Sequence, residues 1–399
     1  MATWAYCFDH LVAEQVPLAP AQEDQIISDL EARLERLAGT GEVSDPWSAK
    51  DVAYRLATYY RRKGRKDDVR RVLMTPGRAF EELAKTAMPM VGAAWMRDMY
   101  DLYREFGLTA EAEALDPLLA ELGQKTKGDL RPITRDVEIP RERFEEVAKA
   151  VSGSDLSNSL SLVARAFLVD PERAEQDVLR LAKEAPLHAV LPQVYLDARG
   201  RAESEVGGVD DDIQGRVVAQ MRDRMGTVDA VFLRHAIRTV IERFTPSATA
   251  LTDCLFQSPV FEAPQRGLVE RAMQAYLDDD WAAFAHLVVP QLEQAVRTLV
   301  IKLGGSHLAP RRGGGLNLRP LDDLLRDSKV DALLKPKFCR YLQVVLTDQR
   351  GLNLRNAICH GYLPADQFGQ LLADRLFHVL VFLGQLREST PPPAPTTRS

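Results

Sequence analysis

The chain has 399 residues, which at roughly 150 residues per domain suggests two or three domains. Hydrophobic residues make up 46% and charged residues 27%, so the composition is globular and excludes disordered and collagen-like chains. The net charge of −6 does not by itself select a class of partner.

Cysteine usage and apolar runs bear on the compartment. The four cysteines are scattered, which predicts neither a disulfide framework nor a cysteine-based metal site and fits a reducing compartment. No apolar stretch approaches the roughly 18 residues of a membrane helix. The start of the chain lacks the basic-then-apolar order of a secretory signal. We therefore expect a cytoplasmic protein without a membrane partner.

Apolar residues recur three and four positions apart along nearly the whole chain, which predicts an all-α fold. The first predicted helix covers Glu23 to Leu37 and ends at two glycines. A weak repeat follows, in which residues 51–73 align with residues 93–119 at an offset of 43. The aligned pairs are Leu56 with Met99, Tyr60 with Tyr103, and Gly64 with Gly107.

Each copy of the repeat reads as helix, turn, helix, and resembles tetratricopeptide-type helical hairpins. Two copies are fewer than a self-standing solenoid needs, so an irregular helical bundle is an equal alternative. We expect residues 1–125 to form this helical region and to bind a protein partner.

Composition changes suggest the remaining boundaries. Residues 126–140 are polar, contain two prolines and predict a linker. A middle helical region is expected over 141–265, with a glycine-rich acidic loop at 200–212. A further helical domain is expected over 266–388, and residues 389–399 predict a disordered tail.

The predicted helices of this last domain are Arg266–Leu277, Asp280–Leu303, Lys337–Thr347, Leu352–His360 and Pro364–Arg387. Pro290 should kink or split the second of them. Gly304–Pro320 reads as a flexible basic loop. Between Gly304 and Gly361 there are ten Lys and Arg against five Asp, a net +5. Such a segment can bind nucleic acid. Alternatively, its charged side chains are scattered over the surface and simply solvated.

The most informative segment is Thr347–Leu363, with the core Arg355-Asn-Ala-Ile-Cys-His360-Gly361. It resembles the HEPN superfamily of small helical domains, and in particular the family with the string Arg-Asn-x-x-x-His-Gly. The resemblance covers about Arg266–Arg387, a third of the chain. It implies an α-helical domain in which Arg355, Asn356 and His360 are catalytic.

The helical period places Asn356 and His360 on one face of the helix and Arg355 on another. At about 100° per residue, Asn356 and His360 lie about 40° apart, whereas Arg355 and His360 lie about 140° apart. One helix therefore does not easily aim both charged groups at one atom. The resemblance implies a homodimer through the C-terminal domain, in which motif helices meet and form a composite cleft.

The resemblance also implies the chemistry, which is cleavage of RNA without a metal or other cofactor. The ribose 2′-OH would attack the adjacent phosphate and leave a 2′,3′-cyclic phosphate and a 5′-OH. His360 suits proton transfer near neutral pH, and Arg355 suits stabilisation of the phosphate charge. Asn356 would orient the histidine or bond the phosphate. A role in toxin or phage-defence systems follows from the fold-level resemblance alone.

Four further residues are candidate substrate-binding groups. Glu293 forms an i, i+4 pair with Arg297, which is either a solvated helix pair or a support for the cleft. Asp348, Arg350 and Asn353 precede the motif helix. Asp348 or Asn353 would cap that helix, and Arg350 would be a second phosphate contact.

A structural interpretation stands beside the catalytic one. A histidine in the last turn followed by glycine is also how helices end, and Arg355 can be an ordinary salt-bridge partner. The alternative function is a non-catalytic interaction or scaffold protein whose HEPN-like domain dimerises or binds RNA or a nucleotide.

Overall fold

A computed structural model describes residue 8 and residues 19–131, 137–197 and 200–388. It confirms the all-α prediction, because helices make up almost all regular structure of these residues and the strands form only two short pairs. None of the described helices is long and apolar enough to cross a membrane. The predicted tail, 389–399, lies outside the described residues.

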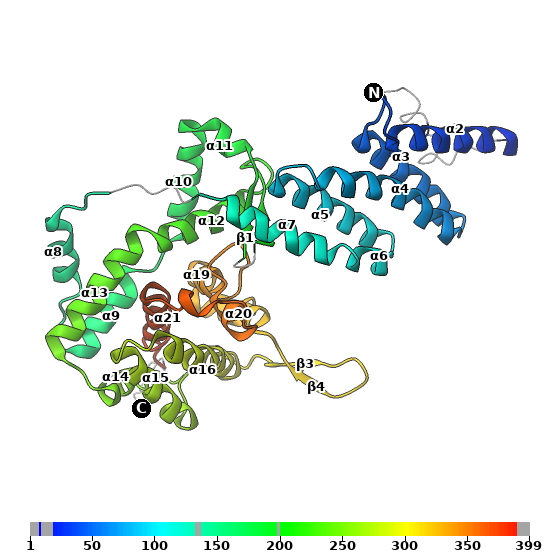
Figure 1. Cartoon of the computed structure of the whole chain (residues 1–399). Helices are drawn as coiled ribbons and strands as arrows, with labels where there is room; N and C mark the ends of the chain where they lie inside the picture. Colours follow the sequence, from blue (N-terminus) through cyan, green and yellow to red (C-terminus); the bar gives the residue numbers. More distant parts are fainter. Residues whose placement is uncertain (1–7, 9–18, 132–136, 198–199, 389–399) are drawn as a thin grey trace, which may run out of the picture. The chain divides into compact units, whose positions relative to one another are not determined.

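The chain divides into two compact units (Figure 1). Unit 1 comprises Met1–Thr134 and Arg199–Ala202, and unit 2 comprises Arg135–Ala198 and Glu203–Ser399. Each unit has its own hydrophobic core. The predicted regions 141–265 and 266–388 both contribute to the core of unit 2.

Unit 1 is a series of helices that pack mainly on helices close to them along the chain. They are α2 (Pro20–Ala38), α3 (Pro46–Arg62), α4 (Lys66–Ala84), α5 (Pro89–Glu105), α6 (Thr109–Glu113) and α7 (Asp116–Asp129). Local chemistry sets the starts: the Asp45 carboxylate accepts hydrogen bonds from the backbone N–H groups of Trp47 and Ser48, at 3.1 and 3.2 Å, and caps α3. Because α7 continues to Asp129, the first four residues of the predicted linker are helical.

The two repeat copies have the same turn. Gly64 and Gly107 adopt left-handed φ angles of 72° and 78°. After α3 the Arg65 N–H bonds the Tyr60 carbonyl at 2.9 Å, and after α5 the Leu108 N–H bonds the Tyr103 carbonyl at 2.8 Å. This is the Schellman pattern, which ends a helix at a glycine. Both tyrosines are buried, so the aligned positions have equivalent structural roles.

Unit 2 is a helical bundle. Its helices are α8 (Arg141–Ala150), α9 (Leu156–Ala166), α10 (Pro171–Glu184), α11 (Pro186–Val190), α12 (Ile213–Gly226), α13 (Val228–Phe244), α14 (Ala248–Leu255), α15 (Arg266–Leu277), α16 (Trp281–Lys302), α17 (Leu321–Leu325), α18 (Ser328–Leu334), α19 (Pro336–Leu346), α20 (Leu354–Cys359) and α21 (Gln370–Leu383), with 3₁₀ turns η1 (Ala263–Gln265) and η2 (Ala365–Gln367).

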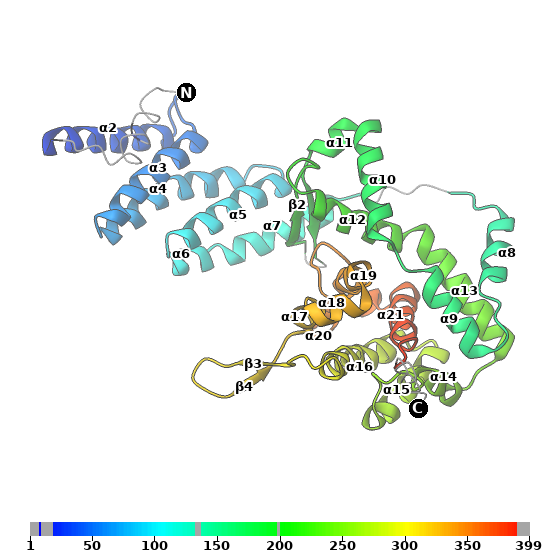
Figure 2. The same cartoon turned by 180° about the vertical axis from the view of Figure 1, so that it is seen from behind.

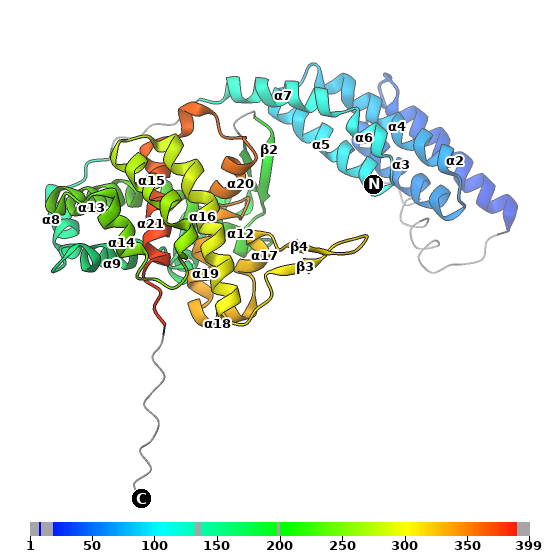
Figure 3. The same cartoon turned by 90° about the horizontal axis from the view of Figure 1, so that it is seen from below.

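The helix α21 forms the centre of this bundle, since every residue from Ala373 to Leu383 is buried. Figure 3 shows α16 beside it, and α9, α13 and α14 also contact it. Figure 2 shows α17 and α18 next to α19. A helix that is buried on all sides, as α21 is, belongs to the interior of such a bundle.

Three local predictions are corrected. The helix α16 is not split at Pro290 but continues to Lys302, held by its buried apolar side chains. The predicted loop 200–212 contains strand β2 (Ala202–Val206), which pairs with β1 (Gln193–Leu196). In β2, exposed glutamates alternate with less exposed residues, which is the two-residue period of a strand.

The third correction concerns Gly304–Pro320, which contains a hairpin of β3 (Leu308–Pro310) and β4 (Leu316–Leu318). The antiparallel register pairs Leu308 with Leu318 and Pro310 with Leu316. Three glycines with positive φ, 313–315, make the turn. The hairpin extends away from the helices of unit 2 (Figure 1).

Candidate functional site

The motif lies on the short helix α20, which contacts α16 and α19. Leu354 and Ile358, four residues apart, are its buried residues and anchor one face. Gly361, at φ 67°, ends the helix, because its N–H bonds the Ile358 carbonyl and the Tyr362 N–H bonds the Ala357 carbonyl. His360 is therefore the C-cap residue, as the structural interpretation of the sequence predicted.

The segment before α20 packs closely on α19. A Cβ placed on Gly351 would lie 2.2 Å from the Val344 carbonyl oxygen, so only glycine fits there. The Leu352 N–H donates to the same carbonyl at 2.7 Å. These contacts fix where the motif helix begins.

Arg355 is held by two side chains. Its Nε donates to Glu293 Oε2 at 3.0 Å, and its Nη1 donates to Asn356 Oδ1 at 3.0 Å. The other carboxylate oxygen of Glu293 accepts from Arg297 Nη2 at 2.9 Å. The predicted Glu293–Arg297 pair therefore forms, and Glu293 also contacts the motif. Two guanidinium groups share one carboxylate, which leaves a net positive charge.

Asn356 continues the same network towards β2. Its Nδ2 donates to Asn353 Oδ1 at 2.8 Å and to the Thr347 carbonyl at 3.4 Å. Asn353 in turn donates from Nδ2 to Glu203 Oε1 at 2.8 Å. Glu203 was not predicted as part of the site, because an acidic segment between glycines resembles a solvated loop. The alternation of residues in β2 was the available signal.

Asn353 is the N-cap residue of α20, but not in the predicted way. Its backbone is left-handed at φ 50°, and its side chain makes no capping hydrogen bond. Its amide instead bonds Asn356 and Glu203. A left-handed asparagine is unfavourable but tolerated, since its short polar side chain can bond locally.

Asp348 and Arg350 form a separate pair. Asp348 Oδ1 accepts from the Arg350 backbone N–H and from Nε, at 3.0 and 3.1 Å, and Oδ2 accepts from Nη2 at 3.1 Å. Burial disfavours the charged carboxylate, but these hydrogen bonds outweigh it and lower the pKa of Asp348. Asp348 therefore folds the loop rather than capping α20, and the guanidinium of Arg350 is occupied by it.

His360 is exposed at the end of α20. Its ring lies 6.0 Å from the Tyr362 ring, centroid to centroid, and makes no hydrogen bond to any residue that the structure describes. The structure thus joins Glu293, Arg355 and Asn356 in one network with Asn353. No hydrogen bond among the described residues links His360 to this network or to Asp348 and Arg350.

The thiol of Cys359 is next to this network. Burial raises its pKa, and the nearby Arg355 opposes that shift. Within the described residues, no three His, Cys, Asp or Glu side chains are grouped so that they could hold a metal ion.

No protein-family model matches the chain, and neither does any curated protein or solved structure. The HEPN resemblance therefore rests on the motif residues and on the helices around them.

Proposed function

We propose that the protein is an endoribonuclease that cleaves RNA without a metal, with Arg355, Asn356 and His360 as its catalytic residues. The observation that best supports the proposal is the hydrogen bonding of the Arg355 guanidinium group. Glu293 and Asn356 fix two of its three guanidinium nitrogens, while Nη2 bonds none of the described residues. A guanidinium that is held in place with unused donors is prepared to bind a phosphate.

The residues divide the reaction between them. Arg355 holds the phosphate and stabilises the negative charge that grows on it. Asn356, itself oriented by Asn353, fixes the guanidinium through its Oδ1 atom. The solvent-exposed imidazole of His360 takes the proton of the 2′-OH as that oxygen attacks phosphorus, or gives a proton to the departing 5′-oxygen. The products are a 2′,3′-cyclic phosphate and a 5′-OH.

The proposal includes a homodimer through the C-terminal domain. In one protomer His360 follows the last turn of α20 and has no hydrogen bond to Arg355. A second α20 would bring a histidine to each arginine. The protein would act on RNA in the cytoplasm, in a toxin or phage-defence setting, with the helices of residues 1–125 binding a protein partner.

Two observations favour the alternative, a non-catalytic scaffold with an RNA- or nucleotide-binding domain. His360 and Gly361 form a complete Schellman ending, and Arg355 lies in an ion pair with Glu293. Both roles are sufficient to explain these residues without catalysis.

The test is incubation of end-labelled RNA with the wild-type chain in excess EDTA, followed by analysis of the new ends. We expect cyclic-phosphate ends from the wild type and at least about a hundredfold slower cleavage by His360→Ala. Cys359→Ser, one residue away and also exposed, is the matched control and should retain activity. Equal cleavage by wild type and His360→Ala would overturn the assignment. Dimers that bind RNA without cleaving it would support the scaffold.

A further inference from the structure

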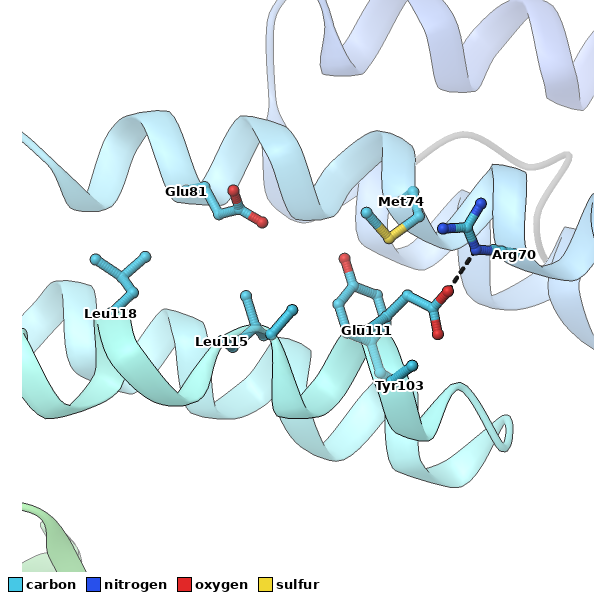
Figure 4. A pocket seen from close by; sticks show the side chains of 9 residues that line it. Arg70, Met74, Glu81, Tyr103, Glu111, Leu115 and Leu118 are labelled. Carbon is cyan, nitrogen blue, oxygen red and sulfur yellow. Dashed lines mark hydrogen bonds and ion pairs between the residues drawn. The ribbon is translucent and has the colours of Figure 1, made fainter.

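Unit 1 contains a cavity of about 350 Å³ that the proposed nuclease does not use. It lies between α4 on one side and α6 and α7 on the other, with a residue of α5 between them (Figure 4). Its lining residues are Arg70, Met74, Glu81, Tyr103, Ala110, Glu111, Ala114, Leu115 and Leu118. The volume falls within the range of small-molecule and side-chain pockets.

The walls of this cavity are mainly apolar. Met74 lies on α4, and opposite it are Leu115, the N-cap residue of α7, and Leu118 on α7 itself. Alanines 110 and 114 leave room between them. A ligand that fills the cavity therefore needs an aliphatic or otherwise apolar part.

An ion pair lies at one end of the cavity. Arg70 Nε donates to the Glu111 carboxylate across from α4 to α6 (Figure 4). This pair satisfies both charges, so neither is the principal attraction for a ligand.

Two other polar groups that line the cavity have no partner among the residues that the structure describes. The Tyr103 hydroxyl is buried without a hydrogen bond, and the residue is 1% exposed. Glu81 makes no hydrogen bond or ion pair with any described residue. Figure 4 shows its carboxylate directed from α4 toward the middle of the gap, above Leu115, and the Tyr103 hydroxyl directed toward Met74.

The space for the Tyr103 hydroxyl is made by Gly77. A Cβ at that position would lie 1.8 Å from the hydroxyl oxygen, so the pair can exist only with glycine there. Buried hydroxyls nearly always have a partner, because an unsatisfied one is costly. A hydroxyl and a carboxylate that line the same mainly apolar cavity and have no partner among the described residues suggest that a ligand completes both.

We propose that this cavity binds a primary ammonium or guanidinium group on an aliphatic stem. The cation would donate to the Glu81 carboxylate and to the Tyr103 oxygen, and its stem would lie against Met74 and Leu115. The negative charge of Glu81 would repel an anionic ligand, and a neutral apolar ligand would leave both polar groups unsatisfied. The cation can come from a free amine or from a lysine or arginine of a peptide.

Saturation-transfer NMR on the full chain tests this with pentylammonium, pentanol and pentanoate of equal chain length. We expect pentylammonium to bind at least about tenfold more tightly than pentanol, and pentanoate not to bind. A capped Gly-Lys-Gly peptide forms the second arm. Binding of the peptide would assign a protein partner as the source, and binding of the amine alone would assign a small molecule. Equal binding of pentanol and pentylammonium, or no binding by amine or peptide, would overturn the proposal.

Two variants and a control locate the site. Glu81→Gln should weaken pentylammonium binding about tenfold or more. Glu82→Gln, the exposed neighbour on α4 that pairs with Lys85, is the matched control and should not change it. Equal effects of the two variants would show that the cation binds elsewhere.

Tyr103→Phe separates binding from folding. It removes the orphaned hydroxyl, so the melting temperature of the ligand-free chain should stay the same or rise. Pentylammonium binding should fall several-fold in the same variant. Unchanged binding would exclude the hydroxyl from the site and overturn this part of the proposal.

Discussion

Glu293 on α16 and Arg355 on α20 are 62 residues apart in the sequence, and Glu293 Oε2 accepts a hydrogen bond from Arg355 Nε at 3.0 Å. The same carboxylate binds Arg297, one helical turn further along α16. Glu293 therefore balances two cations, and the side chain of Arg297 is only 9% exposed. Removal of this carboxylate would leave a buried positive charge without a counterion.

Glu293→Ala should lower the free energy of unfolding by roughly 2–4 kcal/mol, because breaking a buried pair by removing one partner leaves the other charge desolvated. Urea unfolding would measure the change. The matched control is Glu242→Ala, which removes an exposed i, i+4 pair with Arg238 and should cost less than about 0.5 kcal/mol. A loss no larger than that of the control would show that Glu293 is not needed to compensate Arg297.

Asn353 should tolerate glycine better than alanine. Both substitutions remove the hydrogen bonds to Glu203 and Asn356. Only alanine retains the cost of a left-handed backbone, since Asn353 has φ 50°. We expect Asn353→Ala to be less stable than Asn353→Gly by about 1 kcal/mol. Chemical denaturation of the two variants side by side checks this, and equal stabilities would mean that the loop relaxes.

His378 makes the stability of unit 2 depend on pH. Burial, together with Arg375, lowers its pKa from 6.5 to about 3, and the ring bonds the Tyr341 hydroxyl at 2.6 Å. The unfolded chain takes up a proton below about pH 6.5 while the folded chain does not. The contribution of His378 to the free energy of unfolding is therefore fully present above about pH 6.5. It is lost as the pH falls from there towards 3, by about 1.4 kcal/mol per pH unit.

Urea unfolding of the wild type and His378→Gln at pH 7, 6 and 5 measures this contribution. The variant should be less stable at pH 7 and should lose less stability on acidification. The control is His286→Gln, since His286 is exposed and its replacement should leave the slope as in the wild type. The same slope in all three proteins would contradict the assignment to His378.

The repeat glycines should resist substitution equally. Gly64→Ala and Gly107→Ala place a side chain on a left-handed backbone with nothing nearby to relieve or worsen it. Each should cost about 1 kcal/mol. Gly128→Ala near the end of α7, where φ is not positive and space is open, should be neutral or stabilising. Thermal unfolding of the three variants distinguishes backbone strain from steric crowding.

The spacing of apolar residues predicted the helices well, because it depends only on residues three and four positions apart in the sequence. The prediction for Arg266–Leu277 coincides with α15, and that for Asp280–Leu303 differs from α16 by one residue at each end. Strands were missed where the pattern was too short, as in β2 with its two glutamates. Turn chemistry was partly readable, since Gly361 was recognised as a helix end.

The site was predictable only as far as its residues are neighbours in sequence. The motif places Arg355 and Asn356 together, and their hydrogen bond follows from adjacency. No local sequence pattern indicates which residues on other helices and strands bond to the motif residues. Glu203 lies 150 residues from Asn353, and only the packed bundle brings them together.

The burial of α21 has a kinetic consequence. Its contacts reach far along the chain, as in the hydrogen bond between His378 and the Ala164 carbonyl, 214 residues apart. In unit 1 each helix packs mainly on its sequence neighbours. Folding rates fall as contacting residues become more distant in sequence, because long loops must close before any contact forms. We therefore expect unit 1 to fold faster than unit 2, because the core of unit 2 forms only when α21 packs against the other helices.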